Sequence, residues 1–142
     1  MPHQVAVFLE NKPGKLEKVT GLLDEAGVNI RAITIADNGD FGVLKLLVND
    51  PEKANDILNR GNLVSALKEV VAMRVMDKPG GLLEISRILN ANGINIDDAY
   101  GFVLESGRTA VFVIQVSEPE KAAAILTEQG VDLLSENDLY YL

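Results

Sequence analysis

The sequence predicts an α+β fold built from two copies of one βαββαβ module, which is the element order of ferredoxin-like domains. Two observations carry this prediction. Segments of the first half recur in the second half, and the apolar pattern switches between strand and helix spacing in the same order in both halves. We place the first module at residues 1–68 and the second at residues 69–142.

The repeat is clearest around two turns that contain Lys-Pro-Gly. Residues 11–30 align with residues 77–96, and the segments end in Gly-Val-Asn-Ile and Gly-Ile-Asn-Ile. Further along, residues 48–58 align with residues 116–126. Repeats of this length are whole small domains rather than units of a solenoid, so we infer that one module was duplicated. A single module buries little apolar surface, and the pair is therefore the expected stable unit.

The first strand and helix of the first module follow from three features. Within residues 4–9, Val5, Val7 and Leu9 alternate with Ala6 and Phe8. This alternation predicts a strand that is covered on at least one face. Pro13 suits the first turn of a helix, because the N–H that proline lacks is not needed there. Apolar residues then recur at helical spacing between residues 16 and 26, and Gly27 is the expected end of this helix.

The second half of the first module begins with a hairpin. Strands are predicted over residues 28–36 and 41–48, because the Asn-Gly pair at 38–39 is a strong hairpin signal. The Asp-Pro pair at 50–51 caps and begins a second helix, which Gly61 ends. A short fourth strand over residues 63–66 completes the βαββαβ order.

The second module repeats these elements in the same order. The predicted strands span residues 71–76, 94–104, 109–116 and 131–134, and the second and third of them form a hairpin. A helix with apolar residues at helical spacing from 82 to 89 follows the first strand. A second helix, with Ala122 and Leu126 facing inward, lies between the last two strands. The final residues 139–142 are expected either to add an edge strand or to dock as a tail.

Composition excludes several classes of site. The net charge of −8 makes nucleic acid an unexpected partner, because phosphate binding relies on clustered lysine and arginine. The chain contains no cysteine, which excludes disulfides, thiolate metal sites and cysteine nucleophiles. The one histidine, His3, is expected to be a solvated residue near the chain end. We therefore expect no metal site and no cofactor.

The N-terminal segment is too short and too polar for a signal peptide. No apolar run reaches the roughly 18–20 residues that a membrane helix needs. We therefore expect a cytoplasmic protein without a membrane partner.

The chain also lacks the common catalytic motifs. It has no phosphate-binding Walker loop, no dinucleotide fingerprint, no His-Glu-x-x-His and no Gly-x-Ser-x-Gly. Its carboxylates fall mainly on the polar faces of predicted helices, where a solvated role is usual. We expect that the protein is not an enzyme.

The repeated turns are the candidate binding elements. Each places a polar residue, a Lys-Pro pair and glycine between the end of a strand and the start of a helix. Gly14, and Gly80 with Gly81, would let a ligand approach the backbone closely. The first-turn amides of a helix favour a carboxylate or a phosphate. Asn11 adds an acceptor oxygen and two donors for the other end of a zwitterion.

Asn29 and Asn95 occupy matching positions between apolar residues, where asparagine is a poor strand former. Structural alternatives remain open for all of these residues. Asn11 and Asp77 could serve only as turn or capping residues. The glycines could serve only tight packing, and the two asparagines could bond a neighbouring loop.

The paired segments 11–30 and 77–96 resemble the ACT domain, a small βαββαβ module that senses amino acids. The resemblance covers nearly the whole chain as two tandem copies. It implies that the modules pack side by side into one eight-stranded antiparallel sheet with four helices on one face. It also implies that amino acids bind at the interface between modules, where the turn of one module meets the second strand of the other.

Carried over residue by residue, the resemblance implies a ligand-binding set in each module. In the first module these residues are Asn11, Gly14, Lys15, Leu16, Asn29 and Ile30. In the second they are Asp77, Gly80, Gly81, Leu82, Asn95 and Ile96.

Both copies together account for the whole chain, which leaves no catalytic domain. The resemblance therefore implies a regulatory protein that binds amino acids and acts on a separate enzyme of amino-acid metabolism. The alternative is an assembly subunit that binds a partner protein and no small ligand. The sequence leaves open whether the two-module unit forms a homodimer through an exposed edge.

The two turns are predicted to be unequal. Asp77 carries a negative charge where Asn11 does not, and Lys15 adds a positive charge that Gly81 lacks. The turn with Asn11 and Lys15 is therefore expected to be the better carboxylate binder, whereas Asp77 favours an ammonium group.

Overall fold

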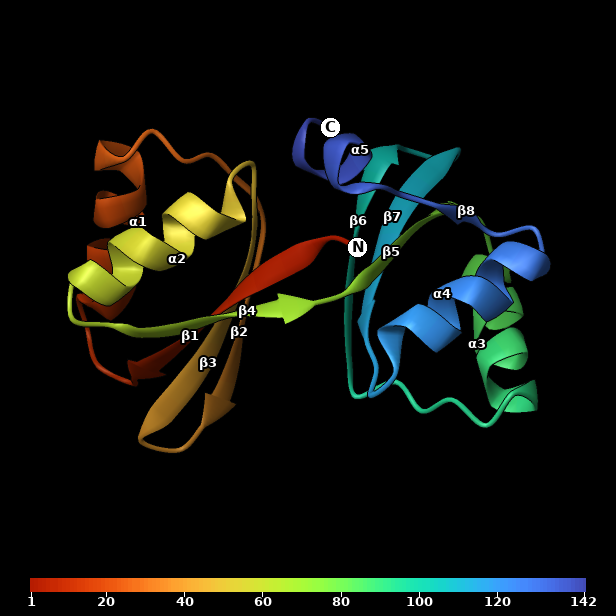
Figure 1. Ribbon diagram of the computed structural model, residues 1–142, viewed down its shortest axis with the longest axis horizontal. Helices are drawn as coiled ribbons and strands as arrows, with labels where there is room; N and C mark the ends of the chain where they lie inside the picture. The colour runs from red at the N-terminus through yellow and green to blue at the C-terminus, as the bar shows by residue number, and fades with distance from the viewer. The chain divides into compact units, whose positions relative to one another are not determined.

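The computed structural model describes residues 1–142. The chain divides into two compact units, and Figure 1 shows the elements of each. The first unit comprises His3–Lys68 with Tyr140–Leu142, and the second comprises Met1–Pro2 with Glu69–Leu139. Each unit has its own sheet and its own pair of long helices.

The first unit follows the predicted βαββαβ order. Its elements are β1 (His3–Glu10), α1 (Lys15–Glu25), β2 (Ile30–Asn38), β3 (Phe41–Val48), α2 (Pro51–Arg60) and β4 (Val64–Glu69). The four strands form one sheet in the order β2-β3-β1-β4, so β2 and β4 are its edges. Asp50 caps α2 as expected, because its side chain accepts a hydrogen bond from the Lys53 amide at 3.1 Å.

The core of the first unit lies on one face of this sheet. Val5, Val7 and Leu9 alternate along β1 and are buried with every second residue of β3. The buried residues of α1 and α2 belong to the same cluster, so both helices cover the same face (Figure 1). The alternating apolar residues of the strands therefore pack against the apolar faces of the two helices, as the sequence predicted.

The second unit repeats the order with changed bounds. Its elements are β5 (Val71–Met76), α3 (Gly81–Ala91), β6 (Asp98–Glu105), β7 (Thr109–Gln115), α4 (Pro119–Glu128), β8 (Asp132–Leu133) and α5 (Glu136–Tyr140). Its sheet has the order β6-β7-β5-β8, with β6 and β8 at the edges. Its core joins Met73, Ile114 and Leu89 with the buried residues of α4.

The α+β class and the duplicated βαββαβ arrangement are confirmed. The single eight-stranded sheet is corrected, because hydrogen bonds join the strands into two separate four-stranded sheets. The number of helices is also corrected, because α5 adds a fifth to the four that were predicted.

Two strands start two or more residues later than predicted. The strand predicted from residue 94 begins at Asp98, because the side-chain amide of Asn95 donates to Asp97 Oδ1 at 3.2 Å and this local bond favours a turn. The strand that was predicted to include Asn29 begins at Ile30. The backbone of Asn29 instead bonds Asn49, whose side chain accepts from the Asn29 amide at 2.9 Å.

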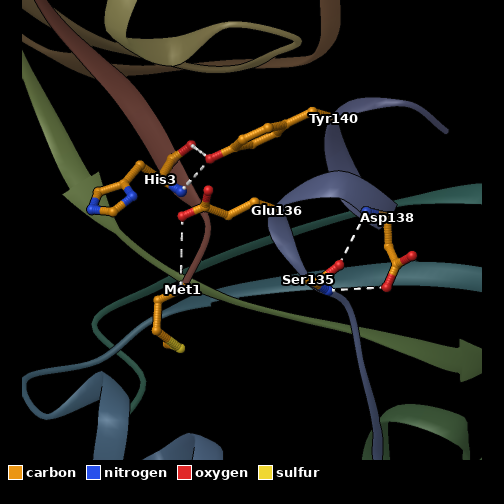
Figure 2. A network of polar contacts seen from close by, with 6 residues as sticks. All are labelled: Met1, His3, Ser135, Glu136, Asp138 and Tyr140. Atoms are coloured by element: carbon orange, nitrogen blue, oxygen red, sulfur yellow. Dashed lines mark hydrogen bonds and ion pairs between the residues drawn. The ribbon is translucent and has the colours of Figure 1, made fainter.

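Helix α5 has a reciprocal cap that the sequence prediction missed (Figure 2). The Asp138 amide donates to the Ser135 hydroxyl at 3.2 Å, and the Ser135 amide donates to Asp138 Oδ2 at 3.2 Å. The hydrogen bond from the Ser135 amide, followed by a hydrogen bond from the Ser135 side chain, holds the pKa of the Asp138 carboxyl below its ordinary value. Ser-Glu-Asn-Asp is thus a capping box with aspartate in the place of the usual glutamate.

The chain ends dock within their units (Figure 2). In the first unit the Tyr140 hydroxyl accepts a hydrogen bond from the His3 amide at 2.8 Å. Arg31 donates from Nε to the Tyr140 carbonyl and from Nη1 to the Leu142 carbonyl, both at 2.9 Å. In the second unit the Met1 ammonium lies 3.8 Å from Glu136. Of the two outcomes expected for residues 139–142, the structure shows the docked tail.

None of the helices has both the length and the apolar character needed to cross a membrane.

Candidate functional site

Both repeated turns start their helices with a glycine in the left-handed conformation. Gly14 precedes α1 with φ of 86°, and Gly80 precedes α3 with φ of 89°. Residues with a side chain adopt this conformation only with strain. Neither helix start receives a hydrogen bond from a capping side chain, and the first-turn amides of such a helix attract anions.

Asn11 ties the first turn to the β2–β3 hairpin. Its side-chain amide donates to the Gly39 carbonyl at 3.1 Å and approaches Asp37 Oδ1 at 3.5 Å. Its backbone amide donates to the Asp40 carbonyl at 2.7 Å. Asn11 therefore has a structural role as a tether.

Asp77 makes the equivalent tether with opposite polarity. Its Oδ2 accepts a hydrogen bond from the Gly107 amide at 2.7 Å, and its own amide donates to the Arg108 carbonyl at 3.1 Å. The first hairpin presents a carbonyl to the turn, which requires a donor, whereas the second presents an N–H, which requires an acceptor. The hairpin that each turn meets thus explains why one copy carries an amide and the other a carboxylate.

This difference predicts unequal effects of exchanging the two groups. Asn11→Asp should destabilise the protein by about 1–2 kcal/mol, because a carboxylate would face the Gly39 carbonyl and the Asp37 carboxylate. Asp77→Asn should cost less than about 1 kcal/mol, because the amide oxygen can still accept from Gly107. Urea unfolding of both variants measures the two costs. Equal costs would show that the polarity of the hairpin does not select the residue.

A cleft of about 400 Å³ lies beside the second turn and within the second unit. Asp77, Lys78 and Leu82 line it from the turn and the first helical turn of α3. Its remaining walls come from the end of β5 and from the middle of the β6–β7 pair: Val75, Met76, Gly101, Phe102, Val103, Ala110, Val111 and Phe112. The cleft therefore combines two charged groups with a mostly apolar wall.

The two glycines of this turn line a different hollow. Gly80 and Gly81 belong to a groove of about 240 Å³ on the α4–β8 side of α3, which Lys78 also borders. Arg74 and Asp132 flank this groove as an ion pair with atoms 3.6 Å apart. The predicted residues of the second turn are thus divided between two hollows, which have Val75, Met76 and Lys78 in common.

The first turn has a groove that corresponds to the smaller hollow. It measures about 200 Å³, and Lys15, Lys18 and Glu10 contribute its charges. Glu10 lies 2.9 Å from Lys12 Nζ and 3.9 Å from Lys15 Nζ. These lysines, first Lys12 through its hydrogen bond, lower the pKa of the Glu10 carboxyl. Glu10 thereby offsets part of the positive charge that Lys15 brings to the first turn.

The other predicted residues lie apart from the cleft. Leu16 is 40% exposed on α1, and Asn29 is exposed just before β2. Ile30 and Ile96 are partly buried against the cores of their own units. The Asn95 side chain donates to Asp97 within its own loop. Ligand contact by these residues stays a prediction.

The residues that sequence reasoning missed are Lys78 and the strand residues of the cleft. Val75, Val103 and Phe112 were assigned to strands, but alternation alone does not show which strand residues border a hollow. The Lys-Pro-Gly motif itself contained the signal for Lys78, since the same lysine is repeated as Lys12.

Comparison with known proteins points to one family. The family model described as the ACT domain pair matches residues 1–142. A crystal structure of a protein from Bacteroides thetaiotaomicron is 37% identical, covers 99% of this chain and 96% of its own, and superposes with a TM-score of 0.93. A probable acetolactate synthase small subunit from Archaeoglobus fulgidus is 27% identical over 114 residues, which are 68% of this chain and 72% of that protein.

A more distant likeness concerns the fold alone. The regulatory subunit of aspartate kinase from Thermus thermophilus is 15% identical, and the match covers 89% of this chain and 91% of that one. Its TM-score is 0.64.

Proposed function

The chain belongs to the ACT domain pair family, and we propose that it binds amino acids and thereby regulates a separate enzyme of amino-acid metabolism. The role is regulatory rather than catalytic. The similarity to the Archaeoglobus fulgidus protein supports this proposal, because that protein is named as a probable acetolactate synthase small subunit and the match covers 68% of this chain.

The observation that carries the proposal is the cleft beside the β5–α3 turn. Its volume of about 400 Å³ falls in the range of roughly 300–1,000 Å³ that is usual for small-molecule sites. A mostly apolar wall with a few polar groups is also typical of such sites. The cleft therefore has the size and composition for a ligand of amino-acid size.

The charged groups of the cleft match the two ends of a zwitterion. Asp77 Oδ2 accepts a hydrogen bond from the Gly107 amide. The carboxylate has further lone pairs that can accept from an ammonium group. Lys78 lies beside it on the same turn, lines the same cleft and can bind the ligand carboxylate. The ligand side chain would then lie against the strand residues. We also propose that a second ACT module forms the other wall of the ligand site, as the family resemblance implies.

The direct test is thermal unfolding of the full chain against each common amino acid at millimolar concentration. A ligand at a hundredfold its dissociation constant stabilises the folded protein by ~2.7 kcal/mol. We expect at least one amino acid to raise the melting temperature. If none does, amino-acid binding is refuted and the assembly-subunit alternative takes its place.

Two neighbouring leucines provide a matched pair of variants. Leu82 lines the cleft and is 48% exposed, whereas Leu83 does not line it and is 50% exposed. Leu82→Trp should fill the cleft and abolish the ligand-induced rise, because the larger ring occupies the ligand volume. Leu83→Trp should retain the rise. Equal responses of the two variants would place the ligand elsewhere on the protein.

A further inference from the structure

Strand β6 carries two small residues on the face of its sheet that α3 and α4 cover. Ala99 pairs with Ile114, which belongs to the core, and Gly101 pairs with Phe112, which packs against that core. Directly paired residues of neighbouring strands project from the same face of a sheet, so both small residues belong to the helix-covered face. Glycine inside a strand often marks a place where another group approaches the backbone closely.

The equivalent strand of the first unit has large side chains at the matching places. In the first sheet Ile33 pairs with Leu46, and Ile35 pairs with Leu44. Leu44 and Phe112 each stand three residues after the first residue of their strand, so Ile35 matches the glycine of β6 and Ile33 matches the alanine. The two units therefore differ in how much space the edge strand leaves on this face.

The backbone of β7 keeps a side chain out of the Gly101 position. A Cβ there would lie 2.9 Å from the Val111 carbonyl oxygen and 3.7 Å from Phe112 Cδ1, and the first of these distances is too short for a Cβ. Gly101 and Phe112 both line the cleft of about 400 Å³ beside the β5–α3 turn. The cleft is therefore open at a place where the first unit carries an isoleucine.

The part of the cleft around Gly101 is apolar. Asp77 and Lys78, at the turn, are its only charged side chains, and every other residue that lines it is apolar. An amino acid whose two charged groups bind at the turn therefore finds only apolar groups around its side chain. Burial here favours an apolar side chain, whereas a charged side chain would lose its hydration without a partner.

We propose that Gly101 determines which amino acids this protein binds, because the space at this position holds a large apolar side chain in the second unit, whereas Ile35 fills the matching position in the first. This inference rests on the proposed binding of amino acids in the cleft. It assigns one ligand to each chain, bound by the second unit, and it makes Phe112 the second specificity-determining residue.

Calorimetric titration of the full chain with L-alanine, L-leucine, L-phenylalanine and L-aspartate tests the class of side chain. We expect one molecule of L-leucine or L-phenylalanine per chain, and binding of L-alanine that is weaker by roughly tenfold or more, because it buries fewer apolar carbons. L-Aspartate should not bind.

The outcomes separate this inference from the proposed function. If the protein binds only amino acids with polar side chains, binds L-alanine as tightly as L-leucine, or binds two molecules per chain with equal affinity, this inference is overturned and amino-acid binding stands. Binding of no amino acid would refute the proposed function, and this inference with it.

Two variants should move the preference in opposite directions. Gly101→Ala narrows the cleft and should lower the affinity for L-phenylalanine relative to L-leucine, by roughly tenfold or more, as is usual for one methyl group in an apolar pocket. Phe112→Leu introduces the residue that the first unit has as Leu44. It widens the cleft and should raise the same ratio. A general loss of structure would weaken both ligands alike and leave the ratio unchanged.

Gly42 provides the matched control in the first unit. It is also a strand glycine that faces a carbonyl, since a Cβ there would lie 3.3 Å from the Ala36 oxygen, but it does not line the cleft. Gly42→Ala should keep the parent ratio. If Gly101→Ala unfolds by circular dichroism, Phe112→Leu carries the test. An unchanged ratio in Phe112→Leu, or the same change in Gly42→Ala, would overturn the proposal.

Discussion

The Gly81→Ala variant is expected to lose about 3 kcal/mol of stability, the upper end of the usual cost of overpacking. A Cβ at Gly81 would collide with the Met76 carbonyl oxygen. That oxygen belongs to the backbone of β5 and already accepts from the Lys78 amide at 2.9 Å. The start of α3 must therefore move away from the strand, and this movement changes the turn that carries Asp77 and Lys78.

The first unit contains the control for this variant. Lys15 occupies the matching position at the start of α1 and already carries a side chain. Lys15→Ala should change the free energy of unfolding by no more than about 0.5 kcal/mol, as is usual for a surface substitution. Thermal unfolding of both variants, with and without the amino acid that stabilises the parent, measures stability and binding together. A Gly81→Ala variant as stable as Lys15→Ala would show that α3 can start without this close approach.

The second large effect is expected at alkaline pH. Burial, followed by the nearby Asp98 carboxylate, raises the pKa of the Tyr100 hydroxyl above its ordinary value. The folded protein keeps this proton at pH values where the unfolded chain releases it. The contribution of Tyr100 is therefore fully present below the unfolded pKa of about 10 and is lost as the pH rises toward the folded pKa.

The expected slope for this single group approaches about 1.4 kcal/mol per pH unit above pH 10. Tyr100→Phe should remove that part of the slope, because phenylalanine has no proton to lose. Urea midpoints between pH 9 and pH 11 measure it. Tyr141→Phe, at a tyrosine that is 68% exposed, is the control for loss of a phenolic hydroxyl at the surface. A Tyr100→Phe variant with the parent's slope would contradict the assignment.

The elements of this fold were largely predictable because their signals are local. Gly27 follows the end of α1, Asn38-Gly39 marks a hairpin, and Asp50 caps α2, each close to the predicted place. Pro13, which was predicted in the first turn of this helix, instead precedes its N-cap, Gly14. Local signals also existed for the elements that were missed. The Ser135–Asp138 box begins α5, and the bond from Asn95 to Asp97 delays β6.

The candidate site was predictable only in part. The repeated turns singled out Asp77 and Leu82, which line the cleft, and Gly80 and Gly81, which line the groove beside it. Sequence reasoning did not separate these two hollows. It also did not identify Phe102 or Val111 as wall residues, because a wall depends on which strands neighbour each other in the sheet. That order brings together residues that are far apart in the chain.

The sequence by itself determined the duplicated order of strands and helices, since apolar spacing, glycine and proline act on neighbouring residues. It also determined that each turn needs glycine where the backbone becomes left-handed. Only the tertiary structure decided that the strands form two sheets, and that Asn11 meets a carbonyl where Asp77 meets an amide. The physical reason is that hydrogen-bond polarity and cavity shape are properties of contacting segments, and each segment's sequence describes only one side of the contact.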